Sequence, residues 1–167
     1  MAEEGVDAVR VEAVARRIGV TKGGFYGHFA DRQALLSAIV AQWEDRGTEA
    51  IIAEIDEEHT DAAARAEALW ERATRDGLAV ELAIRDWARR DERIAETVAR
   101  VDRRRMSYLR AIFADMGFKG IDREARCLMV YSLLIGDHFI ALESRRYSRR
   151  GVLDACRRVV AATPRPG

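Results

Sequence analysis

Apolar side chains recur at helical spacing along nearly the whole chain of 167 residues, and no segment keeps the strict alternation of a β-strand. The only two prolines, Pro164 and Pro166, lie at the extreme C-terminal end, so proline interrupts no interior helix. The pattern predicts an all-α protein whose helices end at glycines and begin at capping side chains.

The most informative pattern lies near the N-terminus. The inward side of a first helix is formed by residues at i, i+3, i+4 and i+7: Val11, Val14, Ala15 and Ile18. Gly19 can leave this helix with positive φ, and Thr21 can cap a second helix that we expect to extend to Phe29. Phe25 and Phe29 lie one turn apart and can pack on the first helix. This order predicts a helix-turn-helix unit.

Three glycines make the second helix unusual, because each costs about 1 kcal/mol relative to alanine in a helix interior: Gly23, Gly24 and Gly27. A helix that lies in a DNA groove benefits from missing side chains, since its backbone can approach phosphates and base edges closely. Lys22, Tyr26 and His28 face outward and can donate hydrogen bonds to DNA. The alternative from spacing alone is a weak helix or a turn-rich loop.

Further helices follow. Asp31 caps a helix that we expect to continue past Gly47 to Ile55, and the acidic patch at 56–61 marks a boundary. The next helices are expected to end at Gly77, to span Leu78 to Trp87 with Leu78, Leu82 and Ile84 inward, and to run from Asp91 to a C-cap at Gly117. His59 within the acidic patch allows a metal site, although a solvated loop with an N-cap at Thr60 or Asp61 is the simpler interpretation.

The C-terminal part predicts two helices with more apolar surface than one core can cover. A helix from Asp122 to Glu143 is apolar nearly all round between Cys127 and Ile135, and Ser148 starts the last helix. A second copy of the chain is the simplest cover for the remaining face. The predicted dimer interface consists of Tyr131, Ile135, Phe139, Val152, Cys156 and Val159. We interpret Asp137 and His138 as a core histidine held by its neighbour, with a ligand-recognising pair as the alternative.

Residues 5–43, and above all the run TKGGFYGHFADRQALL, resemble the DNA-binding domain of TetR-family (tetracycline-repressor-like) transcriptional regulators. The resemblance implies a two-domain homodimer, with a helix-turn-helix DNA-binding domain at 1–46 and a helical ligand-binding and dimerisation domain at 47–167. It also implies a repressor that binds double-stranded operator DNA and releases it when a small-molecule effector binds. The implied DNA-binding residues are Thr21, Lys22, Gly23, Tyr26, His28 and Arg32.

The resemblance includes one departure, because TetR-family proteins begin with an additional amphipathic helix and here only residues 1–5 correspond to it. We therefore expect a truncated DNA-binding domain in which most of the first helix is missing. A start codon assigned too far downstream is the favoured explanation, and a shortened product is the alternative. An N-terminal peptide of the native protein that began at Met1 would contradict the favoured one.

Charge and composition narrow the function without naming a ligand. The chain has 28 basic and 28 acidic residues, but from Arg16 to Ala30 the charged side chains are all basic. The arginine-rich segment 85–105 can be a second nucleic-acid surface, although its alternating signs favour a solvent face with i,i+4 pairs. An effector pocket between central helices would draw on apolar and aromatic groups: Trp70, Trp87, Tyr108, Phe113, Met116, Met129 and His138.

Several function classes are not expected. The chain lacks the common catalytic motifs, its three histidines are widely separated, and we expect no enzyme, cofactor or metal site. Cys127 and Cys156 lie in apolar helical runs and predict buried, inert thiols of a cytoplasmic protein. The longest apolar run is about half the length that a bilayer requires, so we expect no membrane partner. The alternative function is a DNA-free helical module for small-molecule binding or dimerisation.

Overall fold

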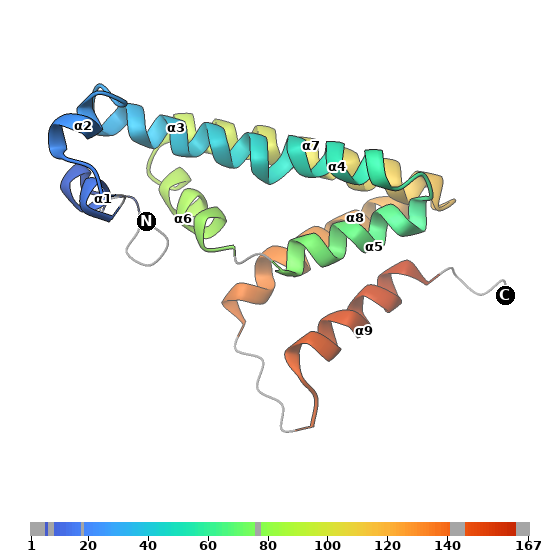
Figure 1. Ribbon diagram of the computed structural model, residues 1–167. Coiled ribbons are helices and arrows are strands. Elements are labelled where there is room, and N and C mark those ends of the chain that lie inside the picture. Colours follow the sequence, from blue (N-terminus) through green and yellow to red (C-terminus); the bar gives the residue numbers. More distant parts are fainter. Residues whose placement is uncertain (1–5, 7–8, 18, 76–77, 141–145, 163–167) are drawn as a thin grey trace, which may run out of the picture. The chain divides into compact units, whose positions relative to one another are not determined.

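The protein is all-α in the computed structural model, which describes residues 6, 9–17, 19–75, 78–140 and 146–162 (Figure 1). No strand occurs in these ranges, as the sequence pattern predicts. The helices are α1 (Val11–Arg17), α2 (Lys22–Tyr26), α3 (Arg32–Glu44), η2 (Asp45–Glu49), α4 (Ala50–Glu58), α5 (Ala62–Arg75), α6 (Ala79–Ala88), α7 (Glu92–Asp115), α8 (Gly120–Gly136), η3 (Asp137–Phe139) and α9 (Arg149–Ala161).

Two compact units share the chain. The N-terminal unit comprises Met1–Glu54 and Gly77–Arg104, and the C-terminal unit comprises Ile55–Asp76 and Arg105–Gly167. Their borders therefore fall within α4 and α7, so that α6 and the first half of α7 belong to the unit that contains the helix-turn-helix. The functional division expected at residues 46 and 47 remains a prediction.

One apolar core joins the helix-turn-helix to α3, α6 and α7 in the N-terminal unit. Its largest fully buried members are Phe25, Leu36, Ile84 and Val101, each from a different helix. Burial of such side chains contributes roughly 1.5–3 kcal/mol each. The helix-turn-helix is therefore stabilised by α6 and α7, which follow it by more than fifty residues in the sequence.

Helix ends follow the predicted capping signals. The Asp31 carboxylate accepts a hydrogen bond from Ala34 N–H at 2.7 Å, and Ser148 Oγ accepts one from Gly151 N–H at 3.1 Å. Gly117 adopts φ +91° two residues after the end of α7, and Phe118 N–H donates to the Phe113 carbonyl, as in a glycine C-cap. Of the two predicted N-caps, Thr60 and Asp61, it is Asp61 that caps α5: its carboxylate accepts a hydrogen bond from Ala64 N–H at 2.9 Å.

The helix that begins at Arg32 continues past Gly47, as predicted, but not with uniform geometry. Five residues, Asp45–Glu49, form a π turn between α3 and α4. Ala50 N–H donates to the Asp45 carbonyl, five residues back, where an α-helix would use a carbonyl four residues back. The apolar periodicity predicted the length of this helix but gave no sign of the π turn.

The C-terminal unit has its own core between α7, α8 and α9. Cys127 and Phe118 are buried in it, together with Arg126, whose guanidinium lies 4.0 Å from the centre of the Phe118 ring. Arg126 also donates to the Val160 carbonyl and to Asp122 Oδ2, so its buried charge is paired.

The prediction that α8 extends to Glu143 is wrong. The helix ends at Gly136, a 3₁₀ turn follows at Asp137–Phe139, and Ile140 is extended. The Asp137 carboxylate and carbonyl accept hydrogen bonds from Arg149 of α9, which holds the chain in this turn. In the described ranges, no helix is both long and apolar enough to cross a bilayer.

Candidate DNA-binding interface

The first helix and the turn of the helix-turn-helix have the predicted form. Val11 and Ala15 are buried on the inner side of α1, whereas Arg16 and Arg17 are exposed at its end. Gly19 has φ +74°, which confirms its role in leaving the helix. Ile18 and residues 1–5, including the expected remnant of an additional helix, lie outside the described residues.

The second helix is shorter than predicted. Thr21 Oγ1 caps it by accepting Gly24 N–H at 3.0 Å, but α2 ends at Tyr26, and Gly27 and His28 form a turn. Phe25 is 1% exposed, and its ring centre lies 5.3 Å from that of the half-buried Phe29. The two rings therefore hold the turn against the core although Phe29 is not helical, which corrects the predicted extent of the helix.

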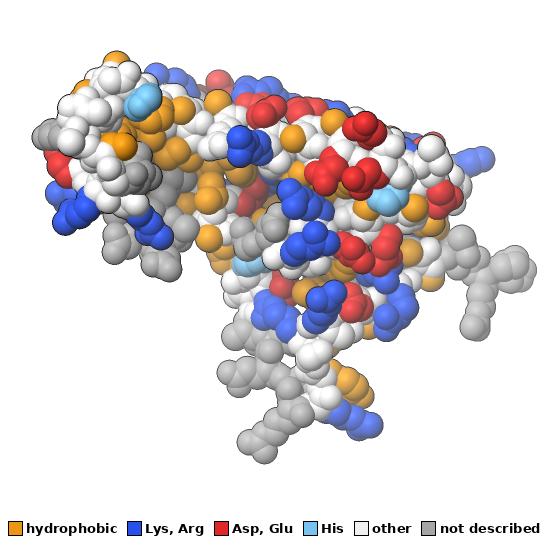
Figure 2. Space-filling model, viewed as in Figure 1, with side chains coloured by type: hydrophobic (Ala, Val, Ile, Leu, Met, Phe, Trp, Pro, Cys, Tyr) orange, Lys and Arg blue, Asp and Glu red, His pale blue; other side chains and the backbone are white. Residues whose placement is uncertain are grey.

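Polar groups of this segment remain available to a partner. Tyr26 is 46% exposed, its ring packs edge-on against Phe25, and its hydroxyl has no hydrogen-bond partner among the described residues. His28 is exposed beside it. Figure 2 shows basic side chains gathered near α1, in agreement with exposed Arg16 and Arg17. The side chain of Lys22 lies outside the described part of the structure.

The three glycines of the segment differ in what the fold requires of them. A Cβ added at Gly27 would lie 3.2 Å from the Gly24 carbonyl oxygen, and one at Gly24 would lie 3.3 Å from Thr21 Oγ1. Packing within the turn therefore disfavours side chains at both positions. At Gly23 the nearest atom would be 3.9 Å away, which leaves room for a methyl group. The fold itself does not explain the missing side chain at Gly23.

Arg32 is engaged within the unit. Its Nε donates to the Val9 carbonyl at 2.7 Å and its Nη2 donates to the Val6 carbonyl at 2.6 Å, so the side chain ties the start of α3 to the segment before α1. Such charge-assisted bonds fix the direction of the guanidinium. The structure thus gives Arg32 an internal role that the sequence did not indicate, and its contact with DNA stays a prediction.

The N-terminal unit also contains a polar cluster around the buried Glu81, which sequence reasoning missed. Glu81 is 4% exposed, and its carboxylate accepts Trp43 Nε1–H at 2.8 Å and Arg85 Nε–H at 2.7 Å. Arg85 also forms two hydrogen bonds with Asp102, at 2.6 and 3.2 Å. The cluster connects α3, α6 and α7. The sequence feature that could have indicated this cluster is the charged Glu81 among the apolar residues of α6. Leu82, which was expected to point inward, is half-buried.

Ion pairs also explain the arginine-rich segment. Arg90 pairs with Asp86 at i,i+4, as predicted for a solvent face. Arg100 and Arg104 instead reach across to Glu44 and Glu49 on the neighbouring helix. The hydrogen bond from Arg100 is the main cause that lowers the pKa of the Glu44 carboxyl below its ordinary value of 4.5.

The predicted effector residues do not all come together. Trp70 lines two cavities of the C-terminal unit: His138 shares a larger one of about 510 Å³, and Phe113 and Met116 share a small apolar one of about 40 Å³. Tyr108 is buried and donates to Asp56 at 2.7 Å, so it belongs to the packing of α4 and α7.

Two further effector candidates lie away from these cavities, and a second expectation about His138 fails. Met129 is exposed on α8, and Trp87 is buried in the core of the N-terminal unit. The interpretation of His138 as a core histidine is wrong, because its side chain is exposed. The neighbouring Asp137 carboxylate binds Arg149 instead, and a 3₁₀ turn follows Gly136.

The residues expected at a dimer interface are unevenly exposed. Phe139 and Val159 are 72% and 73% exposed, whereas Tyr131, Ile135, Val152 and Cys156 are half-buried. Further apolar side chains on α8 are open to solvent as well, namely Ile121, Leu128 and Met129. Cys127 is fully buried, and burial raises the pKa of its thiol; Cys156 is only half-buried, which corrects the expectation of two buried thiols.

Comparison with known proteins agrees with the geometry of the N-terminal segment. Residues 1–39 match the family model described as bacterial regulatory proteins of the tetR family. The matched range includes α1, the turn at Gly19, α2 and the first half of α3. No curated protein matches the chain.

Proposed function

Since residues 1–39 match the family model of bacterial regulatory proteins of the tetR family, we propose that the chain is a DNA-binding transcriptional regulator and a ligand-responsive repressor. In this proposal the turn and helix from Thr21 to His28 bind double-stranded operator DNA, and a small molecule bound in the C-terminal unit releases the operator. The protein acts as a homodimer in the cytoplasm, and it needs no cofactor or enzymatic activity.

The observation that carries the DNA-binding part is the surface of α2. The capped helix presents a glycine whose missing side chain packing does not require and an exposed tyrosine whose hydroxyl has no partner among the described residues, and the turn after it presents an exposed histidine. Such a surface lets the backbone approach phosphates while side chains donate to them. Thr21, Lys22, Gly23, Tyr26 and His28 are the proposed contacts, with Arg32 supporting them from the start of α3.

The effector part rests on the larger cavity of the C-terminal unit. Its volume of about 510 Å³ is within the range of small-molecule sites, and its lining combines Trp70, Leu134 and Leu153 with charged groups such as Arg150 and Asp154. A medium-sized ligand with an aromatic or aliphatic body and polar ends suits this lining.

The dimer part rests on apolar surface that the C-terminal unit leaves uncovered. Ile121 and Leu128 lie on one face of α8 and are 85% and 60% exposed, and Val159 projects from α9. A two-fold contact between copies buries such a surface without a second kind of partner. It also pairs two helix-turn-helix units, as operators with two half-sites about one helical turn apart require.

The test is fluorescence anisotropy of labelled DNA from upstream of its own gene, titrated with the chain over a salt series. We expect sub-micromolar binding whose logarithm falls steeply with the logarithm of salt concentration, because Lys and Arg release counterions from phosphates. A scrambled duplex of equal length is the control. A folded dimer that binds neither duplex at low salt would contradict the proposal and would favour a DNA-free helical module.

A further inference from the structure

The π turn between α3 and α4 determines which side chains share a face of this long helix. The turn spans Asp45–Glu49, and its diagnostic hydrogen bond runs from Ala50 N–H to the Asp45 carbonyl. A π turn takes about one residue more than an α turn for the same rotation. Thus the helix contains one residue more between Glu44 and Ala50 than regular α geometry would accommodate.

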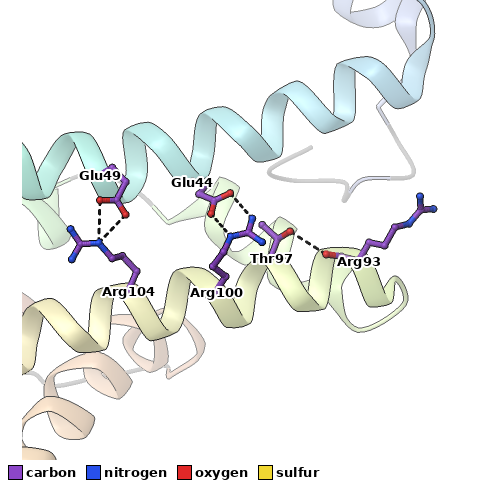
Figure 3. Close-up of polar contacts among 6 residues, drawn as sticks. All are labelled: Glu44, Glu49, Arg93, Thr97, Arg100 and Arg104. Atoms are coloured by element: carbon purple, nitrogen blue, oxygen red, sulfur yellow. Dashed lines mark hydrogen bonds and ion pairs between the residues drawn. The ribbon is translucent and has the colours of Figure 1, made fainter.

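Two ion pairs flank this extra residue (Figure 3). Glu44 accepts hydrogen bonds from Arg100 Nε at 2.7 Å and Nη2 at 2.8 Å, and Glu49 accepts Arg104 Nε–H at 3.0 and 3.1 Å. The two arginines are four residues apart on α7 and therefore lie on one face of it. The two glutamates that meet them are five residues apart.

The unequal spacing links the second ion pair to the π turn. In an α-helix each residue advances about 100° around the axis, so residues four apart differ by about 40° and residues five apart by about 140°. With regular α geometry from Glu44 onward, Glu49 would point away from α7 by about 100° more than it does. Only the wider turn brings Glu44 and Glu49 onto the face that meets Arg100 and Arg104.

The residues before the π turn, in α3, are held by contacts other than the two ion pairs. Trp43 binds the buried carboxylate of Glu81, and Phe25 of the helix-turn-helix shares its core with Leu36 of α3. A change from π to α geometry would therefore rotate α3, and the helix-turn-helix packed on it, by about 100° relative to the residues that follow Glu49. Rotation of this size would change the angle between α4 and the body formed by α3 and the helix-turn-helix.

We propose that Glu49 and Arg104 are positioning residues for DNA binding: their ion pair retains the π turn, and the π turn sets the rotation of α3, with the helix-turn-helix packed on it, relative to α4. The proposal rests on the DNA-binding function proposed above. Glu49 and Arg104 are 51% and 41% exposed, so their pair changes the equilibrium between the two geometries by only up to about fivefold. A ligand or DNA that binds one of the two geometries more tightly would shift the same equilibrium.

The first experiment compares Glu49→Gln and Arg104→Gln with Glu54→Gln, which removes the same charge as Glu49→Gln from an exposed position of α4 without a described partner, five residues further along the chain. We expect operator affinity to fall about two- to fivefold for the first two variants and to remain unchanged for the third. The exchanged pair Glu49→Arg with Arg104→Glu should recover most of the loss. Equal affinities for Glu49→Gln and Glu54→Gln would overturn the proposal.

A deletion separates the π turn from the charge itself. Removal of the exposed Arg46 leaves four residues in the turn, so a regular α-helix then places Glu44 and residue Glu49 on one face. We expect Glu49→Gln combined with this deletion to bind DNA like the parent, since the helix no longer has a second geometry to adopt. A combined variant as weak as Glu49→Gln alone would show that the ion pair acts in another way.

A measurement without DNA distinguishes this proposal from the proposed function. Trans-hydrogen-bond NMR couplings identify the acceptor of Ala50 N–H, which is Asp45 in the π form and Arg46 in the α form. We expect a mixture of the two acceptors in Glu49→Gln and Asp45 alone in the parent. Unchanged couplings in Glu49→Gln would overturn the proposal even if the parent binds its operator. If the couplings change in Glu49→Gln but the parent binds no DNA, the ion pair does retain the π turn, whereas its role in DNA binding is refuted together with the proposed function.

Discussion

Gly23 and Tyr26 show how single residues can separate stability from recognition. Tyr26 projects a hydroxyl that has no hydrogen-bond partner in the described part of the chain, and Gly23 omits a side chain for which the fold has room. Residues that serve only the fold would fill such space and satisfy such groups. Both positions therefore provide variants that should alter DNA binding without harming the folded state.

For Gly23→Ala we expect a more stable protein that binds its operator more weakly. Alanine raises helix propensity by up to about 1 kcal/mol, and its methyl group would meet no atom closer than 3.9 Å. The same methyl group would stand between the helix backbone and DNA. Urea unfolding and fluorescence anisotropy measure the two effects, and a variant that gained both stability and affinity would contradict a close approach at Gly23.

Tyr26→Phe removes one hydroxyl from an exposed side chain. We expect an unchanged free energy of unfolding and a loss of about 1.5–3 kcal/mol in operator binding, as for a hydrogen bond to a charged phosphate. Anisotropy titrations at one salt concentration measure the loss, and Tyr147→Phe, at another exposed tyrosine, is the control. Equal affinity of Tyr26→Phe and the parent would remove Tyr26 from the interface.

At the scale of elements, polar contacts join the helices of the N-terminal unit as specifically as its apolar core does. The carboxylate of Glu81 is shared by Trp43 of α3 and Arg85 of α6, and Arg85 continues to Asp102 of α7. Because Glu81 is buried and its hydrogen bond with Trp43 joins the two helices, its geometry leaves little freedom for α3 to turn relative to α6. Helix α3 packs on the helix-turn-helix, so the cluster also helps to fix the position of the helix-turn-helix relative to α6.

Glu81→Ala should destabilise the folded protein by about 1–3 kcal/mol, because it leaves the Trp43 indole N–H buried without an acceptor and takes one carboxylate from Arg85. Urea unfolding followed by tryptophan fluorescence measures the change. Glu54→Ala, on the exposed face of α4, should alter stability by less than about 0.5 kcal/mol. Similar effects of the two variants would mean that the cluster contributes no net stability.

At the scale of the whole molecule, α8 and α9 leave apolar side chains exposed to solvent. Val159 and Leu128 are exposed although each lies on a helix whose other face is packed in the core. Isolated apolar side chains on a surface are ordinary, but several along neighbouring helices indicate a contact site. The dimer that we propose would use this surface.

Val159→Glu should therefore shift the protein from dimer to monomer while the helical content stays unchanged. A buried carboxylate at a two-fold contact appears twice and has no partner, which costs several kcal/mol per dimer. Sedimentation velocity at micromolar concentration measures the shift. Val80→Glu, at an exposed position of α6, should leave the association state unaltered. A Val159→Glu protein that sediments like the parent would exclude α9 from the interface.

The sequence by itself determined the features that depend on neighbours within about one helical turn. The all-α class, the caps at Thr21, Asp31 and Ser148, and the exits at Gly19 and Gly117 follow from local backbone geometry and side-chain chemistry. The resemblance of the N-terminal segment to the tetR family could be recognised from the sequence because the motif is contiguous.

Only the tertiary structure decided which residues meet across helices. The link from Arg32 to the Val6 and Val9 carbonyls, the burial of Glu81, the turn after Gly136 and the exposure of His138 all depend on partners at least nine residues away. The π turn belongs here as well, since its extra residue becomes meaningful only when Arg100 and Arg104 face Glu44 and Glu49. Helical periodicity predicts which side of a helix is apolar, but not which helix will lie against it.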